Sequence, residues 1–220
     1  MFDRSPDQSN RVRVKICGIT NEGDACAAIE CGADAIGFNF WPESKRYVDI
    51  GIASRWIRDL PGQVFKIAVL VDPTWEQALT IGGLSFIDGL QLHGSESADF
   101  CRRLAAQNIV FAKAVPVRDS ISLSNLASFS TQTLVLDSGI GALGGSGKTF
   151  PWESARQFVK EHPELRVILA GGLTAGNVTE AIREVSPFGI DVSTGVESSP
   201  GCKDKKLVRA FIDAARLAQS

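Results

Sequence analysis

The feature of this 220-residue sequence that most limits its possible folds is a regular alternation of short apolar runs and longer amphipathic segments. The apolar runs have the length and composition of strands, and the segments between them repeat their hydrophobic residues at helical spacing. Alternating strands and helices give parallel strands joined by right-handed crossovers. The pattern predicts strands near residues 12–17, 35–40, 65–71, 86–91, 109–114, 133–137, 166–170 and 188–192. It predicts helices over 21–31, 50–60, 95–106, 120–128, 151–160, 175–185 and 203–218, and one more that opens at Asp72-Pro73.

Eight strand–helix units without a linker favour a single α/β domain. Within about 210 residues they match the size of a compact (β/α)8 TIM barrel, with eight parallel strands inside and helices outside. We therefore expect one barrel domain over residues 11–220, preceded by a polar, frayed leader at 1–10. An open doubly wound sheet is the alternative, but such sheets commonly have fewer strands and a clear switch point.

The composition argues against nucleic acid and membranes as partners. With 23 basic and 25 acidic residues, the formal charge is −2, so there is no basic excess to bind a phosphate backbone. No apolar stretch is long enough to span a bilayer, and the first residues lack a signal-peptide core. The five cysteines have no CxxC spacing, which fits neither a disulfide framework nor a zinc site. We expect a cytoplasmic monomer or homodimer with a small-molecule substrate.

Polar residues at the carboxyl ends of the predicted strands are the first candidates for a site, because barrel enzymes place their chemistry there. Too few histidines and acidic residues gather at ligand spacing to predict a catalytic metal. The candidates are Cys17 after the first strand, Arg46 in the loop after the second, Gln91 and His93 at the fourth, Asp137 at the sixth, and Asp191 and Ser193 at the eighth.

Cys17 and Asp137 are the strongest pair for acid–base work. Cys17 lies on the side of its strand that also carries Arg13 and Lys15, and nearby cations favour a thiolate, which can act as nucleophile or base. Asp137 either caps the following loop or points into the barrel mouth, where partial desolvation would raise its pKa and suit it to proton donation. In a closed barrel the two side chains could face one another across a substrate.

The residues leave two possible roles open for His93. It is either held by hydrogen bonds at the top of the barrel or in contact with the substrate. The other histidine, His162, precedes the seventh strand and therefore belongs to the opposite end of the barrel.

Glycine-rich turns after the last two strands predict a phosphate site. Gly171 and Gly172 follow the seventh strand, and Ser193 and Gly195 follow the eighth. Backbone N–H groups can approach an oxyanion closely at such turns, and barrels often bind phosphate there. The alternative is that these glycines only permit tight turns.

Residues 142–149 (ALGGSGKT) nearly match a nucleotide-binding P-loop, with alanine in place of its first glycine. The context disagrees, because Pro151 stands where the first turn of a P-loop helix should be. A mobile loop over the barrel mouth fits these residues better. A P-loop-type nucleotide-binding protein remains the alternative.

Several motifs together resemble the phosphoribosylanthranilate isomerases of tryptophan biosynthesis. They occur in order and cover everything except the leader. The motifs are KICGIT at 15–20, GF at 37–38 with SKRYV at 44–48, QLHG at 91–94, GGSGKTF at 144–150, LAGGL at 169–173 and DVSTGVE at 191–197.

The resemblance implies an Amadori rearrangement of N-(5′-phosphoribosyl)anthranilate without a cofactor. It implies that Asp137 is the general acid that opens the ribose ring and Cys17 the general base that removes the C2′ proton. Arg46 would pair with the anthranilate carboxylate. The glycine turns would hold the phosphate, Asp191 would lie near the sugar hydroxyls, and His93 is carried over as a pocket residue.

Two further alternatives to this isomerase remain. A broader sugar-phosphate isomerase that also serves histidine synthesis is the nearer one, but such barrels usually carry aspartate where Cys17 stands. A non-catalytic phosphosugar-binding barrel is the other. The chain departs from the family pattern at Asn39 and Trp41, which leaves the shape of the aromatic pocket open.

Overall fold

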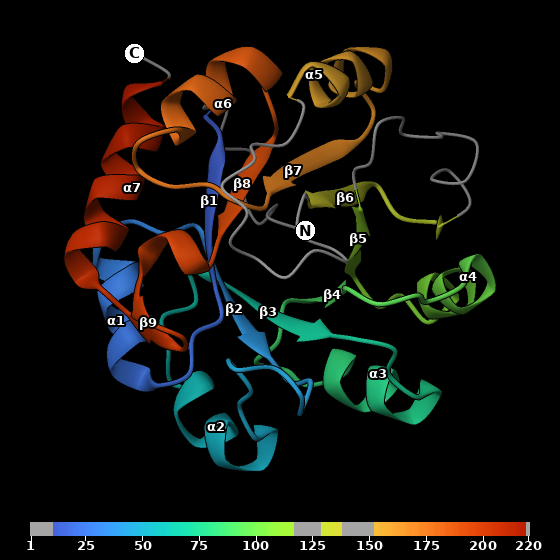
Figure 1. The fold of residues 1–220 in the computed structure, drawn as a ribbon. Helices are drawn as coiled ribbons and strands as arrows, with labels where there is room; N and C mark the ends of the chain where they lie inside the picture. Colours follow the sequence, from blue (N-terminus) through green and yellow to red (C-terminus); the bar gives the residue numbers. More distant parts are fainter. Residues whose placement is uncertain (1–10, 117–128, 138–151, 219–220) are drawn as a thin grey trace.

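A computed structural model describes residues 11–116, 129–137 and 152–218, and its strands close into a parallel barrel (Figure 1). The strands follow one another around the barrel in chain order, and β8 pairs with β1 to close it. The predicted (β/α)8 fold is confirmed. The strands are β1 (Arg13–Cys17), β2 (Ala35–Asn39), β3 (Phe65–Leu70), β4 (Gly89–Leu92), β5 (Phe111–Pro116), β6 (Thr133–Asp137), β7 (Arg166–Ala170) and β8 (Gly189–Val192).

The helices lie around the outside of the barrel (Figure 1). The predicted helix at 120–128, the leader at 1–10 and the P-loop-like residues 142–149 lie outside the described residues. The described helices are α1 (Glu22–Glu30), α2 (Ile50–Ile57), α3 (Trp75–Gly82), α4 (Ala98–Ala106), α5 (Trp152–Glu161), α6 (Val178–Val185) and α7 (Lys205–Leu217).

The strands bury both of their faces, which is why they read as nearly continuous apolar runs. One face of each strand packs under the helices in a large core that includes Ile16, Phe38 and Leu134. The other face lines the barrel interior, where a smaller cluster of short side chains forms. This cluster contains Ala35, Ile67, Ala112, Ala114, Val135, Ile168 and Ala170.

The start of α3 differs from the prediction, which placed the cap at Asp72 and a proline in the first turn. The helix begins after Thr74, whose hydroxyl accepts a hydrogen bond from the Gln77 N–H. Asp72 instead has a positive φ of 44°, and its carboxylate accepts a hydrogen bond from the Ser95 N–H at 2.6 Å. Asp72 therefore hydrogen-bonds to the loop before α4 and does not cap α3.

The start of α4 is also later than predicted, because Glu96 turns inward. Glu96 forms a 2.9 Å ion pair with Lys113 of β5, and both side chains are almost fully buried. Lys113 also donates to the Gly94 carbonyl at 2.7 Å, and Glu96 accepts from the Gly94 N–H at 3.1 Å. These bonds fix the loop that follows β4.

The segment after β8, predicted as a plain loop, contains ordered structure. It begins with the 3₁₀ turn η3 (Thr194–Val196) and continues as a short antiparallel hairpin of β9 (Glu197–Ser199) and β10 (Cys202–Lys203). This hairpin brings two charged side chains to the barrel mouth, as shown below.

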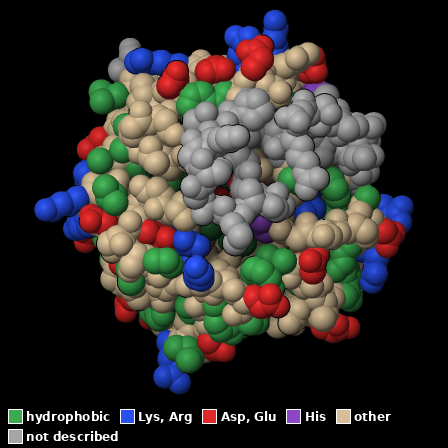
Figure 2. All heavy atoms as spheres, viewed as in Figure 1, with side chains coloured by type: hydrophobic (Ala, Val, Ile, Leu, Met, Phe, Trp, Pro, Cys, Tyr) green, Lys and Arg blue, Asp and Glu red, His purple; other side chains and the backbone are tan. Residues whose placement is uncertain are grey.

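The described surface carries both signs of charge. In Figure 2, acidic and basic side chains are interspersed around this face. None of the described helices has the length and apolar character needed to cross a membrane.

Candidate active site

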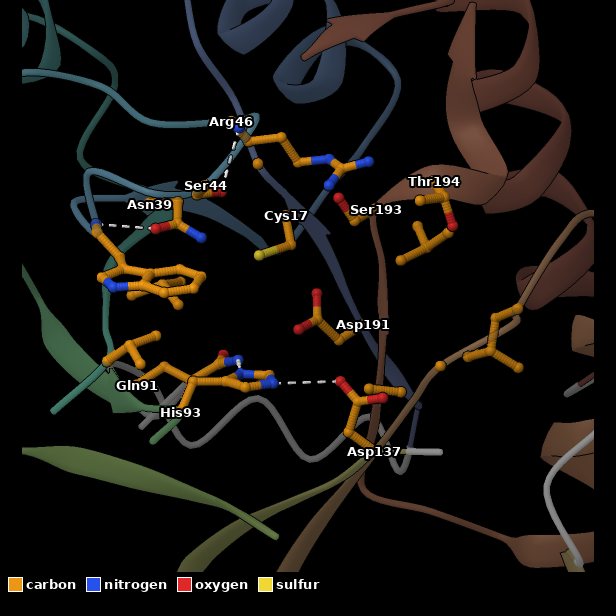
Figure 3. A pocket seen from close by; sticks show the side chains of 18 of the residues that line it. Cys17, Asn39, Ser44, Arg46, Gln91, His93, Asp137, Asp191, Ser193 and Thr194 are labelled. Atoms are coloured by element: carbon orange, nitrogen blue, oxygen red, sulfur yellow. Dashed lines mark hydrogen bonds and ion pairs between the residues drawn. The ribbon is translucent and has the colours of Figure 1, made fainter. Parts of the chain in front are cut away.

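A cavity of about 340 Å³ opens at the carboxyl ends of the strands, which is the end of the barrel where the sequence placed the site. Its size is within the usual range of small-molecule sites. Figure 3 shows its labelled side chains converging from several strands. Of the predicted residues, those that line it are Cys17, Arg46, Gln91, His93, Asp137, Gly171, Gly172, Asp191 and Ser193.

Cys17 ends β1 and is half-buried at the edge of the cavity. Removal of water raises the pKa of its thiol above the ordinary value, the Lys15 ammonium opposes this effect, and Asp191 adds to it. The sequence predicted that nearby cations would favour a thiolate, but burial outweighs them. Arg13 contributes little, since its guanidinium lies 3.9 Å from Asp34, below the site.

Lys15 and Asp191 form a buried ion pair directly beneath Cys17. They are cross-strand partners on β1 and β8, and the ammonium nitrogen lies 2.8 Å from Asp191 Oδ2. Lys15 is 1% exposed and Asp191 is 5% exposed. Among the described residues, Asp191 Oδ1 has no hydrogen-bond partner. Asp191 is thus anchored through Oδ2 alone.

Asp137 ends β6 and meets His93, which follows β4. His93 Nε2 lies 3.3 Å from Asp137 Oδ2, and His93 Nδ1 lies 3.0 Å from the Gln91 side-chain nitrogen (Figure 3). Because an amide nitrogen can only donate, Nδ1 accepts this hydrogen bond and Nε2 carries the hydrogen that faces Asp137. His93 is therefore held by a hydrogen bond from Gln91 and lines the cavity, and its contact with the substrate stays a prediction.

Arg46 reaches the cavity from the loop after β2 and is held by Glu197 of the β9–β10 hairpin. Its Nε and one terminal nitrogen each donate to Glu197 at 2.7 Å. The same carboxylate accepts from Lys203 at 2.7 Å. The stem of Arg46 crosses Gly18, where an added Cβ would clash with it and where φ is +75°. The carboxylate therefore fixes one edge of the guanidinium.

Glu197 and Lys203 were given no role by the sequence. Glu197 belongs to one of the motifs that carried the resemblance, and this is the only signal that could have identified it. Burial opposes its charge, but hydrogen bonds from Arg46 and Lys203 lower the pKa of Glu197 below the ordinary value, so it is a carboxylate at neutral pH. Lys203 is nearly buried and also donates to the Ser193 carbonyl at 3.2 Å.

The glycine turns after β7 and β8 form one wall of the cavity. Gly171 and Gly172 have φ values of +87° and +67°, which favour glycine. Asn177 braces this turn by donating to the Gly172 carbonyl at 3.0 Å. Gly195 does not line the cavity. It lies against the Leu173 carbonyl, where any Cβ would clash, so close packing of the two loops requires glycine there.

The described residues contain no group of three or more His, Cys, Asp or Glu side chains placed to hold a metal ion. The charged groups that line the cavity include Arg46, Asp137 and Asp191. A closed parallel barrel with a thiol, a carboxyl and a held guanidinium at the carboxyl ends of its strands defines a (β/α)8-barrel enzyme for a small anionic substrate.

Comparison with known proteins identifies the family within this class of enzymes. A model of the N-(5′-phosphoribosyl)anthranilate (PRA) isomerase family matches residues 14–214. The N-(5′-phosphoribosyl)anthranilate isomerase of Thermotoga neapolitana is 43% identical over 205 residues, which cover 93% of this chain and 98% of the relative.

Solved structures agree with this match. The crystal structure of phosphoribosyl anthranilate isomerase from Thermotoga maritima has a TM-score of 0.85 at 40% identity and covers 93% of this chain and 98% of its own. A second structure of phosphoribosyl anthranilate isomerase, in complex with reduced 1-(o-carboxyphenylamino)-1-deoxyribulose 5-phosphate, has a TM-score of 0.80 at 38% identity and the same coverage. The chain belongs to the N-(5′-phosphoribosyl)anthranilate isomerase family, and the predicted resemblance is confirmed.

Proposed function

We propose that this isomerase converts N-(5′-phosphoribosyl)anthranilate to 1-(2-carboxyphenylamino)-1-deoxyribulose 5-phosphate, with Asp137 as general acid and Cys17 as general base. The reaction is an Amadori rearrangement in tryptophan biosynthesis. The observation that carries the residue roles is their convergence. Asp137 and Cys17 come from β6 and β1, which are not neighbours in the barrel, yet both line one cavity.

The first step is ring opening. Asp137 donates a proton to the ribose ring oxygen, the bond between that oxygen and C1′ breaks, and the lone pair of the anthranilate nitrogen forms a C1′ iminium. The Nε2–H of His93 holds the Asp137 carboxyl from one side. The acid is thereby oriented, and the negative charge left after proton transfer is stabilised.

The second step is proton abstraction. Cys17 removes the proton from C2′, and the electron pair of that C–H bond neutralises the iminium and gives an enolamine. Tautomerisation of the enolamine places a proton on C1′ and forms the C2′ ketone. Because the substrate nitrogen is its own electron sink, these steps need an acid and a base and no covalent bond to sulfur.

Three features of the cavity support substrate binding in this orientation. The free edge of Arg46 offers two N–H groups to the planar anthranilate carboxylate. The turns at Gly171–Gly172 and Ser193 offer backbone N–H groups to the phosphate. The unpaired Oδ1 of Asp191 can accept a hydrogen bond from a sugar hydroxyl, which removes the cost of leaving a buried oxygen without a partner. The related isomerase structure, which is in complex with reduced 1-(o-carboxyphenylamino)-1-deoxyribulose 5-phosphate, supports the same substrate class.

We also infer a cytoplasmic location and a monomeric or homodimeric state. The cysteines of the described residues are all free, which suits a reducing compartment.

The test is to follow the loss of anthranilate-type fluorescence when purified protein meets freshly formed phosphoribosylanthranilate. Turnover supports the proposal. Binding of the reduced product analogue without turnover would indicate a non-catalytic phosphosugar-binding barrel instead. Nucleotide binding is tested in parallel by thermal denaturation with ATP, and no rise in melting temperature is expected.

Removing the guanidinium should mainly weaken substrate binding. In Arg46→Ala we expect KM to rise by about 10- to 100-fold, the loss expected for a charge-assisted hydrogen-bonded pair, with kcat changed far less. Glu197→Gln should give a smaller rise in KM, because the guanidinium remains but its orientation is no longer fixed by a carboxylate. Steady-state kinetics of both variants measure this, and an unchanged KM in Arg46→Ala would contradict the assigned role.

A further inference from the structure

Lys15 is a buried cation that acid–base catalysis by Cys17 and Asp137 does not use. Burial of a charged group is costly unless it is paired, so this lysine needs an explanation. Its partner Asp191 accounts for one of its hydrogen bonds, at 2.8 Å. The ammonium has further donors, and its charge lowers the pKa of the neighbouring Cys17 thiol.

Gly37 has no side chain, and this leaves space for the Lys15 ammonium beside the Cys17 thiol. It is the cross-strand partner of Cys17 on β2. A Cβ on Gly37 would lie 2.9 Å from Cys17 Sγ and 3.0 Å from both Lys15 Cε and Lys15 Nζ. Because the thiol and the ammonium both border this one small space, the missing side chain lets Lys15 extend to the level of Cys17.

The charges that face Cys17 come from four segments. Lys15 lies on β1, Asp191 on β8 and Lys203 on β10, and Arg46 comes from the loop after β2. Arg46 and Lys203 both share the Glu197 carboxylate, which offsets part of their charge. Lys15 is the cation with the strongest effect on the thiol, and burial together with Asp191 works against it.

We propose that Lys15 is a positioning residue that makes the thiolate of Cys17 attainable in this half-buried position. Asp191 fixes the ammonium, Gly37 gives it access, and the ammonium stabilises the negative charge on Sγ once the proton leaves. The catalytic part of this inference rests on the proposed role of Cys17 as the base. The effect of Lys15 on the thiol does not depend on the identity of the substrate.

Burial disfavours the Lys15 charge, but Asp191 and Cys17 outweigh this effect and raise the pKa of Lys15 above its ordinary value. The lysine is therefore a cation at neutral pH. A permanent cation is what stabilisation of a thiolate requires, whereas a lysine that lost its proton near neutrality could not provide it.

The test is the pH dependence of Cys17 alkylation by iodoacetamide, followed by mass spectrometry of the peptide that contains Cys17. This readout separates Cys17 from the exposed Cys26 and Cys202. In wild type, the midpoint should lie above that of an ordinary thiol, about pH 8.5. In Lys15→Gln it should rise further, by at least about one pH unit. Lys113→Gln removes another buried lysine, which pairs with Glu96 away from the site, and should leave the midpoint unchanged.

Gly37→Ala provides a second variant that keeps the lysine. The added methyl group separates the ammonium from the thiol, so the midpoint should again rise. If Lys15→Gln does not fold, this variant decides the question. Unchanged midpoints in the folded variants, or an equal shift in Lys113→Gln, would overturn the inference.

Kinetics distinguish this inference from the proposed function. For Lys15→Gln, kcat/KM should be about tenfold below wild type near neutral pH, and the ratio should approach one as the pH rises above both midpoints. A purely structural role of Lys15 would give a constant ratio. Turnover with an unchanged Cys17 midpoint would refute the role of Lys15 alone, whereas a shifted midpoint without turnover in wild type would refute the isomerase mechanism alone.

Discussion

Replacement of Cys17 by alanine should lower kcat by at least about 10²-fold, which is the usual loss when a general base is removed. Alanine fits the same site and leaves no group that can accept the C2′ proton. Substrate affinity should change much less, because Arg46 and the glycine turns are untouched. The fluorescence assay measures kcat and KM, and the melting temperature checks that the barrel remains folded.

Cys26→Ala is the matched control for this experiment. Cys26 lies on the exposed side of α1, so the same chemical change should leave turnover at the wild-type level. Near-wild-type turnover in Cys17→Ala would exclude the thiol as the base. In the proposed mechanism the thiol acts only as a base, so mass spectrometry of the enzyme during turnover should reveal no adduct on Cys17.

Replacement of Asp137 by asparagine should have an effect of similar size, at least about 10² in kcat. The amide has nearly the same shape as the carboxyl group and can still lie against His93 Nε2, but it cannot donate a proton to the ring oxygen. The expected loss is therefore chemical rather than structural. Single-turnover measurements separate the chemical step from substrate binding and product release.

His93→Gln provides the comparison for Asp137→Asn. The acid is retained in this variant, and only the side chain that neighbours it is changed, so the loss in kcat should be clearly smaller. If His93→Gln were as inactive as Asp137→Asn, the histidine rather than the aspartate would be the better candidate for the acid. Full activity in Asp137→Asn would contradict ring opening by this residue.

The fold could be predicted because its determinants are local. The bounds of β6 and β7 agree with the predicted ranges, since each is a continuous apolar run between polar residues. Helix starts were less predictable because caps compete with tertiary contacts. Asp72 has the chemistry of a cap, yet the Ser95 N–H takes its carboxylate, and Thr74 caps α3 instead.

The candidate site could be predicted only where a rule of the fold points to it. Strand ends identified Cys17, Asp137 and Asp191, because all parallel barrels gather these positions at one end. The ion pairs that orient the site could not be found in this way. Arg46 and Glu197 are 151 positions apart, and no periodicity relates a loop after β2 to a hairpin after β8.

The buried ion pair of Lys15 could not be predicted from the sequence either. In the sequence it is one of several charged residues that alternate with apolar ones, the pattern of a strand with a solvated face. In a closed barrel that face is the interior, and a lysine there is acceptable only with an acidic partner. The partner follows from the β1–β8 register, which the local sequence of β1 does not contain.

The β1–β8 pairing also has a consequence for how the chain is made. Lys15 and Asp191 are 176 positions apart, so β1 leaves the ribosome long before the carboxylate that neutralises its lysine. A partial barrel would have to bury an unpaired ammonium, which disfavours premature docking of β1 into a compact intermediate. Pairing of β8 with β1 then completes the core and the active site together. Recovery of activity during refolding should accordingly report barrel closure itself, and shortened chains that end before β8 should not show partial activity.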